Sequence, residues 1–297
     1  MTKGERRDLR NGLLFAGPYL LGATALIMYP FAASLFFSMT QYNVVSPPVW
    51  VGLENYQRIF TEDDKFWTAI YNTLFFTAFA VPLQLTLSIT LAVLLSQGLR
   101  GTTVFRTIFF LPSIVPIVAS SVLWLWIFNP DSGLINGVLN QLGITSTPGW
   151  LADPNWSKPS FIMMSLWAIG TPMVVFMAGL TDVPRSLYES ADIDGAGPFT
   201  KFRHITIPMI TPTILFNTVM GLIIAFQYFT EVFVMTAGTG RPADSTLFYA
   251  LYLYQNAFNY LRMGYASALA WMLFVLVLSI TVTILISSRR WVHYHGE

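Results

Sequence analysis

The sequence predicts an all-α membrane protein with six transmembrane helices. Hydrophobic residues make up 54% of its 297 residues and charged residues only 10%, whereas roughly a quarter of the residues in a soluble domain are charged. Charges are also missing from six long stretches, each longer than the approximately 20 apolar residues that cross a bilayer as a helix. Backbone polar groups in lipid must be satisfied within the segment, so the spans are expected to be helices.

The charge-free stretches place these helices in order along the chain. Within one transmembrane domain that covers 1–297, we expect spans at approximately residues 13–39, 68–95, 107–128, 160–180, 208–236 and 263–287. Arginines precede the first span, as they do in a signal peptide. Its apolar run is far longer than the roughly 7–15 residues of a signal-peptide core. We therefore expect the first segment to remain in the membrane.

The distribution of Lys and Arg predicts the orientation, because these residues are enriched in cytoplasmic loops. Eleven of the 16 lie on the amino-terminal side of the membrane: Lys3, Arg6, Arg7, Arg10, Arg100, Arg106, Arg185, Lys201, Arg203, Arg289 and Arg290. The other five are Arg58, Lys65, Lys158, Arg241 and Arg262. Both termini are therefore expected in the cytoplasm. The net charge of +1 offers no basic surface for phosphates, so no nucleic-acid partner is expected.

The connection between the third and fourth spans contains a short amphipathic segment. Its apolar residues fall on one helical face: Leu134, Ile135, Val138, Leu139 and Leu142. This pattern predicts a short helix. The helix could lie on the membrane surface or pack on the protein itself, and the pattern does not decide between the two.

The connection between the fourth and fifth spans, residues 181–207, differs from the others because it is rich in charge, proline and glycine. Pro184 and Pro198 are suited to the first turns of helices. The glycines at 195 and 197 predict a break between two short helices. Arg185 and Glu189 stand four residues apart, a spacing that predicts an ion pair on the first of these helices.

Residues of this connection resemble the EAA motif of ABC-importer permeases. That motif reads E-A-A, three residues, Gly, nine residues, Ile, one residue and Leu-Pro. Here the corresponding residues are Glu189-Ser190-Ala191, Gly195, Ile205 and Ile207-Pro208. Ser for Ala and Ile for Leu are the two departures, and both are small changes in volume.

Three further segments narrow the resemblance. VGLENYQRIF, LYESADIDGAGPFTKFRHITIPMITP and FTEVFVMTAGTGRPADST resemble carbohydrate-uptake permeases of the maltose and glycerol-phosphate type, in particular the half that bears a GLxNY element. The resemblance covers nearly the whole chain and implies the type I ABC-importer permease architecture. The GTGRP segment departs from the tighter GGP of the family, so the geometry of this outer loop is expected to differ from that of the family.

The resemblance implies a role for the 181–207 loop and a set of partners. The loop would dock on a separate ATPase subunit through the matching residues Glu189, Ser190, Ala191, Asp194, Gly195 and Pro208. The full machine would contain a homologous second permease, an ATPase dimer that binds ATP and Mg²⁺, and an extracytoplasmic solute-binding protein, in a bacterial or archaeal plasma membrane. This chain has no Walker A sequence. We therefore expect that the chain is not itself an ATPase or another enzyme. We also expect that it holds no cofactor or metal.

Polar and aromatic residues of the fifth predicted span are candidates for a substrate path. Glu231 is the one acidic or basic side chain inside a predicted span, and such a residue is a functional hypothesis by default. Its alternative is to reach interfacial water. At about 100° per residue, one helical stripe holds the following residues: Asn217, Gly221, Ile224, Tyr228 and Glu231, with Gln227 at its border. Amides and aromatic rings of this kind are suited to bind sugars.

The fourth predicted span contributes Trp167, next to a Gly170-Thr171-Pro172 run that predicts a kink. Trp167 could line the path or simply pack in the core. Ser113, Ser120 and Trp124 of the third span are further candidates. Two other functions stay open at this point: an ABC permease for a non-sugar solute, and a secondary transporter driven by an ion gradient. The sequence does not identify the sugar.

The predicted orientation can be tested directly, because the chain contains no cysteine. Single cysteines near Lys201 and near Asp153 should behave oppositely toward a membrane-impermeant thiol reagent in intact cells. The excess of Lys and Arg on the amino-terminal side predicts labelling at 153 and protection at 201. Labelling at 201 without labelling at 153 would overturn the orientation.

Overall fold

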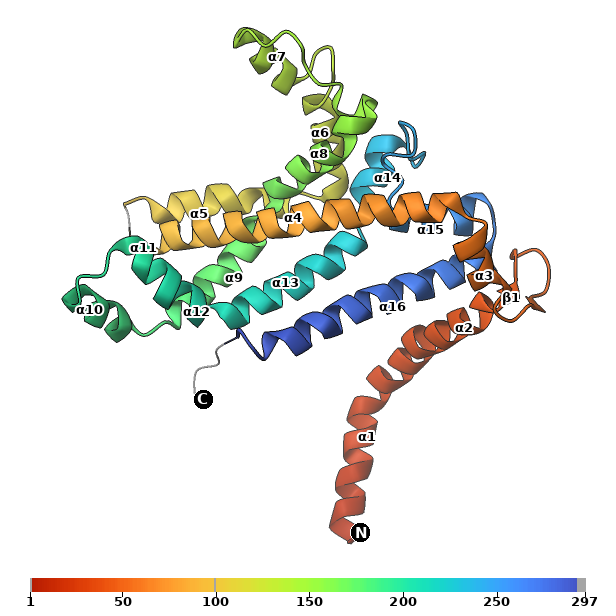
Figure 1. Cartoon of the computed structure of the whole chain (residues 1–297). Coiled ribbons are helices and arrows are strands. Elements are labelled where there is room, and N and C mark those ends of the chain that lie inside the picture. The colour runs from red at the N-terminus through yellow and green to blue at the C-terminus, as the bar shows by residue number, and fades with distance from the viewer. Residues whose placement is uncertain (1, 99, 293–297) are drawn as a thin grey trace. The chain divides into compact units, whose positions relative to one another are not determined.

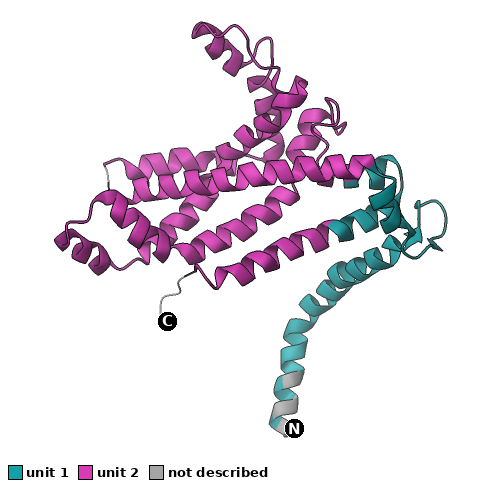
Figure 2. Cartoon of the chain, in the orientation of Figure 1, with its two compact units in different colours: residues 1–63, 253–272 teal, residues 64–252, 273–297 magenta. Residues whose placement is uncertain are grey.

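The computed structural model describes residues 2–98 and 100–292, and these residues are mostly helical. Two compact units divide the chain: residues 1–63 with 253–272, and residues 64–252 with 273–297 (Figure 2). The prediction that residues 1–297 form one transmembrane domain is not tested by this division. Each unit is built largely from long apolar helices, as the composition predicts (Figure 1).

The first unit contains the first membrane-crossing segment. Its elements are α1 (Lys3–Ala23), the π-helical turn η1 (Thr24–Met28), α2 (Tyr29–Ser38), β1 (Thr40–Gln41), β2 (Val49–Trp50), α3 (Glu54–Thr61), the end of α15 (Tyr249–Tyr254), η6 (Gln255–Asn259) and the beginning of α16 (Met263–Ser288). The strands pair antiparallel, with Thr40 opposite Trp50.

The beginning of α16 packs closely on the first crossing segment. The Trp271 indole N–H donates to Ser34 Oγ over 3.1 Å, and the Trp271 ring lies 4.7 Å from the ring of Phe31. At Gly264 an added Cβ would lie 2.0 Å from the carbonyl oxygen of Thr40. Only glycine fits this contact, which brings the last span against the hairpin.

The second unit holds the remaining elements. In chain order they are α4 (Asp64–Ser96), α5 (Thr102–Phe110), η2 (Leu111–Ile114), α6 (Ile117–Ile127), α7 (Leu134–Gln141), η3 (Trp150–Ala152), α8 (Pro154–Ser165), η4 (Leu166–Ala168), α9 (Gly170–Thr181), α10 (Arg185–Ile193), α11 (Pro198–Lys201), η5 (Phe202–Thr206), α12 (Ile207–Met209), α13 (Thr211–Phe226), α14 (Thr230–Thr236), most of α15 and the later part of α16.

Six stretches of the described residues have the length and apolar character of membrane spans. Four are single stretches: Arg10–Ser38, Asp64–Ser96, Thr211–Thr236 and Met263–Ser288. The other two are bent pairs, Thr102–Ile114 with Ile117–Ile127 at 99° and Pro154–Ala168 with Gly170–Thr181 at 47°. Every predicted span thus has a counterpart at its place in the chain.

The third and fourth spans are not straight. The third span, predicted at 107–128, is interrupted, because Pro116 disfavours helical backbone at Val115, which is extended at φ −67° and ψ 129°. The fourth span bends next to Gly170, where a kink was predicted. An added Cβ on Gly170 would lie 2.5 Å from the Phe109 carbonyl oxygen, so glycine allows α9 to approach α5 at the bend.

Helix α4 supplies hydrogen bonds to the bend in the fourth span. The Gln84 amide Nε2 donates to the carbonyl oxygen of Ser165 over 3.0 Å, and the Ser88 hydroxyl donates to that of Ile169 over 3.4 Å. Both carbonyls lie where the helix is interrupted, and carbonyls in a membrane need partners. The Ile169 carbonyl also accepts from the backbone N–H of Met173 over 3.1 Å. Side chains of the continuous helix α4 thus stabilise the bend in the fourth span.

The first turns of α4 do the same for the loop between α14 and α15. Asn72 Nδ2 donates to the carbonyl oxygens of Asp244 and Leu247, over 2.8 and 3.1 Å. Thr73 Oγ1 accepts a 2.8 Å hydrogen bond from the backbone N–H of Tyr249. This loop is therefore held against α4 by buried polar side chains.

The apolar stripe predicted on residues 134–142 is mostly exposed. Leu134, Val138 and Leu142 are exposed, whereas Asn136 is the buried residue of α7. The Trp150 indole N–H donates to Asn136 Oδ1 over 2.7 Å, which fixes the rotation of the helix. Leu134, Val138 and Leu142 therefore do not pack on their own chain, which was one of the two alternatives for this stripe.

Candidate functional site

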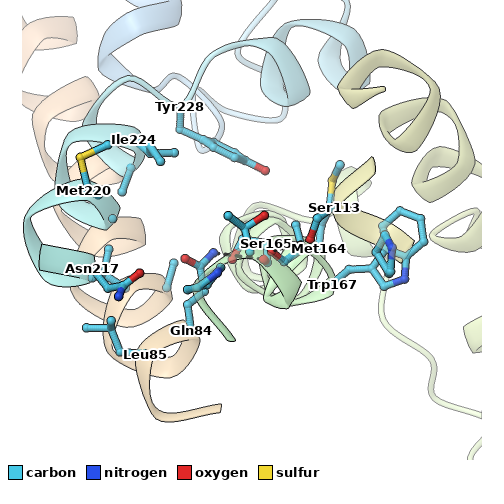
Figure 3. Close-up of a pocket in the computed structure, with 18 of the residues that line it drawn as sticks. Gln84, Leu85, Ser113, Met164, Ser165, Trp167, Asn217, Met220, Ile224 and Tyr228 are labelled. Atoms are coloured by element: carbon cyan, nitrogen blue, oxygen red, sulfur yellow. Dashed lines mark hydrogen bonds between the residues drawn. The ribbon is translucent and has the colours of Figure 1, made fainter. Parts of the chain in front are cut away.

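A cavity of about 630 Å³ lies within the second unit, among α4, η2, α6, the bend between α8 and α9, α13 and α14. This volume falls within the roughly 300–1,000 Å³ typical of small-molecule sites. Its wall is mainly apolar, with eight polar residues: Gln84, Ser113, Ser120, Ser165, Thr171, Asn217, Tyr228 and Glu231. Figure 3 shows several of these side chains around a common space.

The cavity lies where three spans depart from regular helix. The third span is broken at 115–116, the fourth at 166–169 and the fifth at 227–229. Irregular backbone at membrane depth is tolerated where it is covered by protein or lines a polar cavity. The helix breaks and the cavity are therefore one feature of the structure.

The ring of Tyr228, a polar residue of the cavity wall, is held in place by three aromatic neighbours. It lies in the break between α13 and α14, where its ring stacks on Phe76 at 4.4 Å and meets Phe161 and Phe248 edge-on at 6.0 and 5.8 Å. Tyr228 is 7% exposed, yet its hydroxyl has no hydrogen-bond partner. Figure 3 shows this hydroxyl directed into the cavity. A buried hydroxyl usually finds a partner, so its direction marks a place for a ligand group.

Two amides lie on the opposite part of the wall. Gln84 Nε2 is occupied by the Ser165 carbonyl, and Asn217 Nδ2 donates to the carbonyl oxygen of Thr213 in its own helix over 2.9 Å. Both amides therefore keep their side-chain oxygens as acceptors toward the cavity. Together with the Tyr228 hydroxyl they offer spaced hydrogen-bonding groups within an apolar wall.

The structure brings five of the six predicted path residues into the cavity wall: Trp167, Asn217, Gly221, Tyr228 and Glu231. Gln227 is exposed and does not line the cavity. The geometric reason given for the stripe was wrong, because α13 ends at Phe226 and helical spacing does not continue to Tyr228. The break itself turns Tyr228 and Glu231 back toward the space that α13 faces.

The candidates from the third span separate into two groups. Ser113 and Ser120 line the cavity. Trp124 does not, and instead lies behind Trp167, whose ring it meets edge-on at 6.0 Å. The sequence reasoning missed Gln84, Ser165 and Thr171 as wall residues. Gln84 could have been suspected, because an amide in the middle of a long charge-free span needs a partner.

The 181–207 loop forms the predicted pair of short helices, α10 and α11, on either side of a turn. Gly195 adopts φ +73°, a left-handed conformation that favours glycine, and Pro198 is the first residue of α11. The Arg185–Glu189 ion pair is not formed in the described structure. Lys201 of α11 instead pairs with Asp192 of α10, so the ion pair joins the two helices across the turn.

The loop is anchored to the spans by an apolar core. Its buried members are Ile89, Ala92 and Leu95 of α4, Met173, Phe176 and Met177 of α9, and Val183 and Ile210 at the two ends of the loop. Tyr188 of α10 and Phe202 pack on this core, and the Tyr188 hydroxyl lies 2.9 Å from Thr206 Oγ1. On the other side, Leu187, Ile193 and Phe199 are exposed.

Several membrane-crossing helices, a cavity at their breaks and an anchored helical loop together define a polytopic membrane permease. Residues 84–292 match the family described as binding-protein-dependent transport system inner membrane component. The chain therefore belongs to this family of multi-pass inner-membrane transport components, which are permeases and not enzymes.

Relatives agree with this assignment. The chain is 41% identical over 297 residues to the probable ABC transporter permease protein YesP of Bacillus subtilis (strain 168), covering 100% of this chain and 96% of that protein. It is 36% identical over 271 residues to the lactose transport system permease protein LacF of Rhizobium radiobacter, covering 90% of each. The resemblance to ABC-importer permeases is confirmed.

The fold is also found in a solved structure. A chain in the crystal structure of a bacterial alginate ABC transporter, in complex with an alginate pentasaccharide-bound periplasmic protein, has a TM-score of 0.83 and 23% sequence identity, covering 96% of both chains. This likeness shows a shared fold and confirms the predicted type I importer architecture.

The unpartnered hydroxyl of Tyr228 gives a test of the cavity. Tyr228→Phe should leave the midpoint of thermal unfolding unchanged, because the hydroxyl makes no hydrogen bond within the described structure. Uptake at limiting substrate should fall roughly 2–10-fold, the worth of one hydrogen bond. Tyr228→Ala, as the comparison, should lower both, since it removes the stacked ring. Full uptake by the Phe variant would remove Tyr228 from the site.

Proposed function

We propose that this chain is one permease half of an ABC importer that moves a sugar or sugar derivative into the cytoplasm, with both termini cytoplasmic. The cavity at the helix breaks carries the proposal. Its hydroxyl and amide oxygens suit the hydroxyl groups of a sugar, and its aromatic rings suit the C–H faces. A neutral polar solute of this kind needs several spaced hydrogen bonds and little charge, as this wall provides.

The relatives support a carbohydrate substrate. LacF, which is 36% identical to this chain, is a lactose transport system permease by name. The similarity covers 90% of both proteins, so it includes every helix that lines the cavity. The particular sugar depends on residues that differ between the two chains and on the binding protein.

A second permease would complete the cavity. Phe216, Met220 and Ile224 line it, yet all three are exposed on the surface of α13. A large exposed apolar face beside a polar cavity is typical of an interaction surface. A homologous permease seated there would close the path and keep the solute away from lipid.

The loop α10–α11 is the proposed contact for the ATPase dimer, which would bind ATP and Mg²⁺. Its exposed face combines apolar Leu187, Ile193 and Phe199 with the carboxylates of Glu189 and Asp194. An apolar centre with charged neighbours is the usual composition of a protein interface. The inner side of the same helices is anchored on α4 and α9, so movement of the loop would reach the spans.

The transported class can be tested with membrane vesicles that contain this chain, its permease partner and its ATPase. Uptake of a radiolabelled sugar should require ATP and the binding protein together. The ligand of that binding protein, identified by calorimetry, should be a carbohydrate. Uptake driven by a proton gradient without ATP would contradict the proposal, and so would a non-carbohydrate ligand.

The turn between α10 and α11 offers a matched pair of variants for coupling. At Gly195 an added Cβ meets nothing within 4 Å, but the backbone is left-handed at φ +73°. Gly195→Ala should therefore cost about 1–2 kcal/mol in the docked geometry and weaken ATPase binding roughly 5–30-fold. Gly197→Ala, at φ −68° and also with open space around it, is the control.

ATPase retention by the purified permease and ATP-driven uptake are the measurements for this pair. Glu189→Lys should also lower retention, because it reverses a charge on the exposed face. Equal retention by the Gly195 and Gly197 variants would mean that the turn geometry does not matter for docking.

A further inference from the structure

The hairpin after the first span has an unusual composition. The first crossing segment ends at Ser38, yet no charged residue occurs until Glu54. A solvated segment of the intervening length, residues 39–53, would carry about a quarter charged residues. The absence of charge from a segment beyond the end of a span indicates that this segment does not lie in bulk water.

The apolar side chains of the hairpin are exposed on its surface. Val45 is 84% exposed, and the other exposed apolar residues of this segment are Val44, Val49, Trp50 and Leu53. The pair Pro47-Pro48 lies between them and cannot donate backbone hydrogen bonds. The tip has no core of its own that could cover these side chains. Its apolar surface is therefore available to contact a partner or a lipid surface.

The base of the hairpin, by contrast, is fixed by the GLENY residues. Asn55 Nδ2 donates to the carbonyl oxygens of Ser38 and Thr40, over 2.9 and 3.0 Å, and the Tyr56 hydroxyl donates to Ser38 Oγ over 2.7 Å. The bond to Ser38 satisfies a carbonyl that the end of α2 leaves free. The backbone N–H of Val51 also donates to the carbonyl oxygen of Met39 over 2.9 Å. The GLENY element thus caps the first span and holds the hairpin against its end.

The exposed surface of the hairpin continues that of the span. Phe36 on the last turns of α2 is exposed, and its ring lies 5.7 Å from the ring of Trp50. A few residues away, Tyr42 stacks on Phe37 at 4.8 Å. Trp and Tyr are enriched at the level of the lipid headgroups. The aromatic side chains therefore form a continuous surface from the exposed face of the span to the hairpin.

We propose that the hairpin, residues 40–50, is an interfacial anchor that inserts its Val44–Val45 tip into the leaflet opposite the amino terminus. A lipid surface is the occupant we infer, because the exposed apolar and aromatic side chains of the hairpin continue those of the first span, and an uncharged segment with Trp and Tyr suits the headgroup level. The rigid base fixes the depth of the tip relative to α2. The anchor would hold the first span at a set height while other spans move.

The test uses Val45→Cys labelled with an environment-sensitive fluorophore, in the complete transporter reconstituted in lipid nanodiscs. Emission should be blue-shifted and quenched by lipids brominated near the headgroups, since interfacial segments lie about 5–10 Å deep. Quenching by aqueous iodide should be weak. Gln57→Cys, an exposed position on α3, is the matched control and should show the reverse pattern. If the Val45 variant fails to assemble, Val49→Cys on the same surface replaces it.

Three results would overturn the anchor. Iodide quenching equal to that at position 57 would mean that the tip lies in water. A blue shift that appears only after the binding protein is added would assign the tip to that protein. A blue shift without lipid quenching would assign it to the second permease. Each of these results leaves the sugar-importer proposal intact, so the two proposals fail separately.

Discussion

The need to satisfy backbone polar groups inside a membrane determines the form of the second unit. A regular helix satisfies its own groups, but the spans around the cavity are interrupted, and each interruption exposes carbonyls and N–H groups to a medium without water. Side chains of helix α4 donate hydrogen bonds to several of these groups. Gln84 and Ser88 bond to carbonyls at the bend of the fourth span, and Asn72 bonds to carbonyls of the α14–α15 loop. The bend of the fourth span and the α14–α15 loop thus both depend on side chains of this one helix.

The same constraint explains why polar residues occur inside apolar spans. Asn72 and Ser88 are fully enclosed and their polar atoms are used within the chain. Gln84 uses its N–H group on the protein and keeps its oxygen for the cavity. Tyr228 is buried with its hydroxyl unused. The polar residues that stabilise the fold thus differ from those that we propose to bind the solute in what their hydrogen-bonding groups do, and not in their position in a span.

The sequence predicted the spans well, because absence of charge over a membrane thickness has few other causes. It predicted the two-helix loop for a similar reason, since Gly195 and Pro198 act locally. It did not predict that Tyr228 and Glu231 reach the cavity through a break in the fifth span, because the residues at 227–229 include neither proline nor glycine. Gln84 was missed because its partner, the Ser165 carbonyl, belongs to a bend 81 residues away along the chain.

Helix α4 also connects the cavity and the 181–207 loop, both within the second unit. Its middle turns bear Phe76, Ala80 and Gln84 in the cavity wall, and its last turns bear Ile89, Ala92 and Leu95 in the core that anchors the 181–207 loop. At 1.5 Å per residue its 33 residues extend about 50 Å, and its backbone is helical throughout. A tilt of α4 imposed at the loop would therefore move Phe76 against Tyr228 and shift the hydrogen bonds that Gln84 and Ser88 make at the bend of the fourth span. Close packing makes such a core respond by discrete rearrangement and not by gradual deformation, which is the behaviour that an alternating-access path requires.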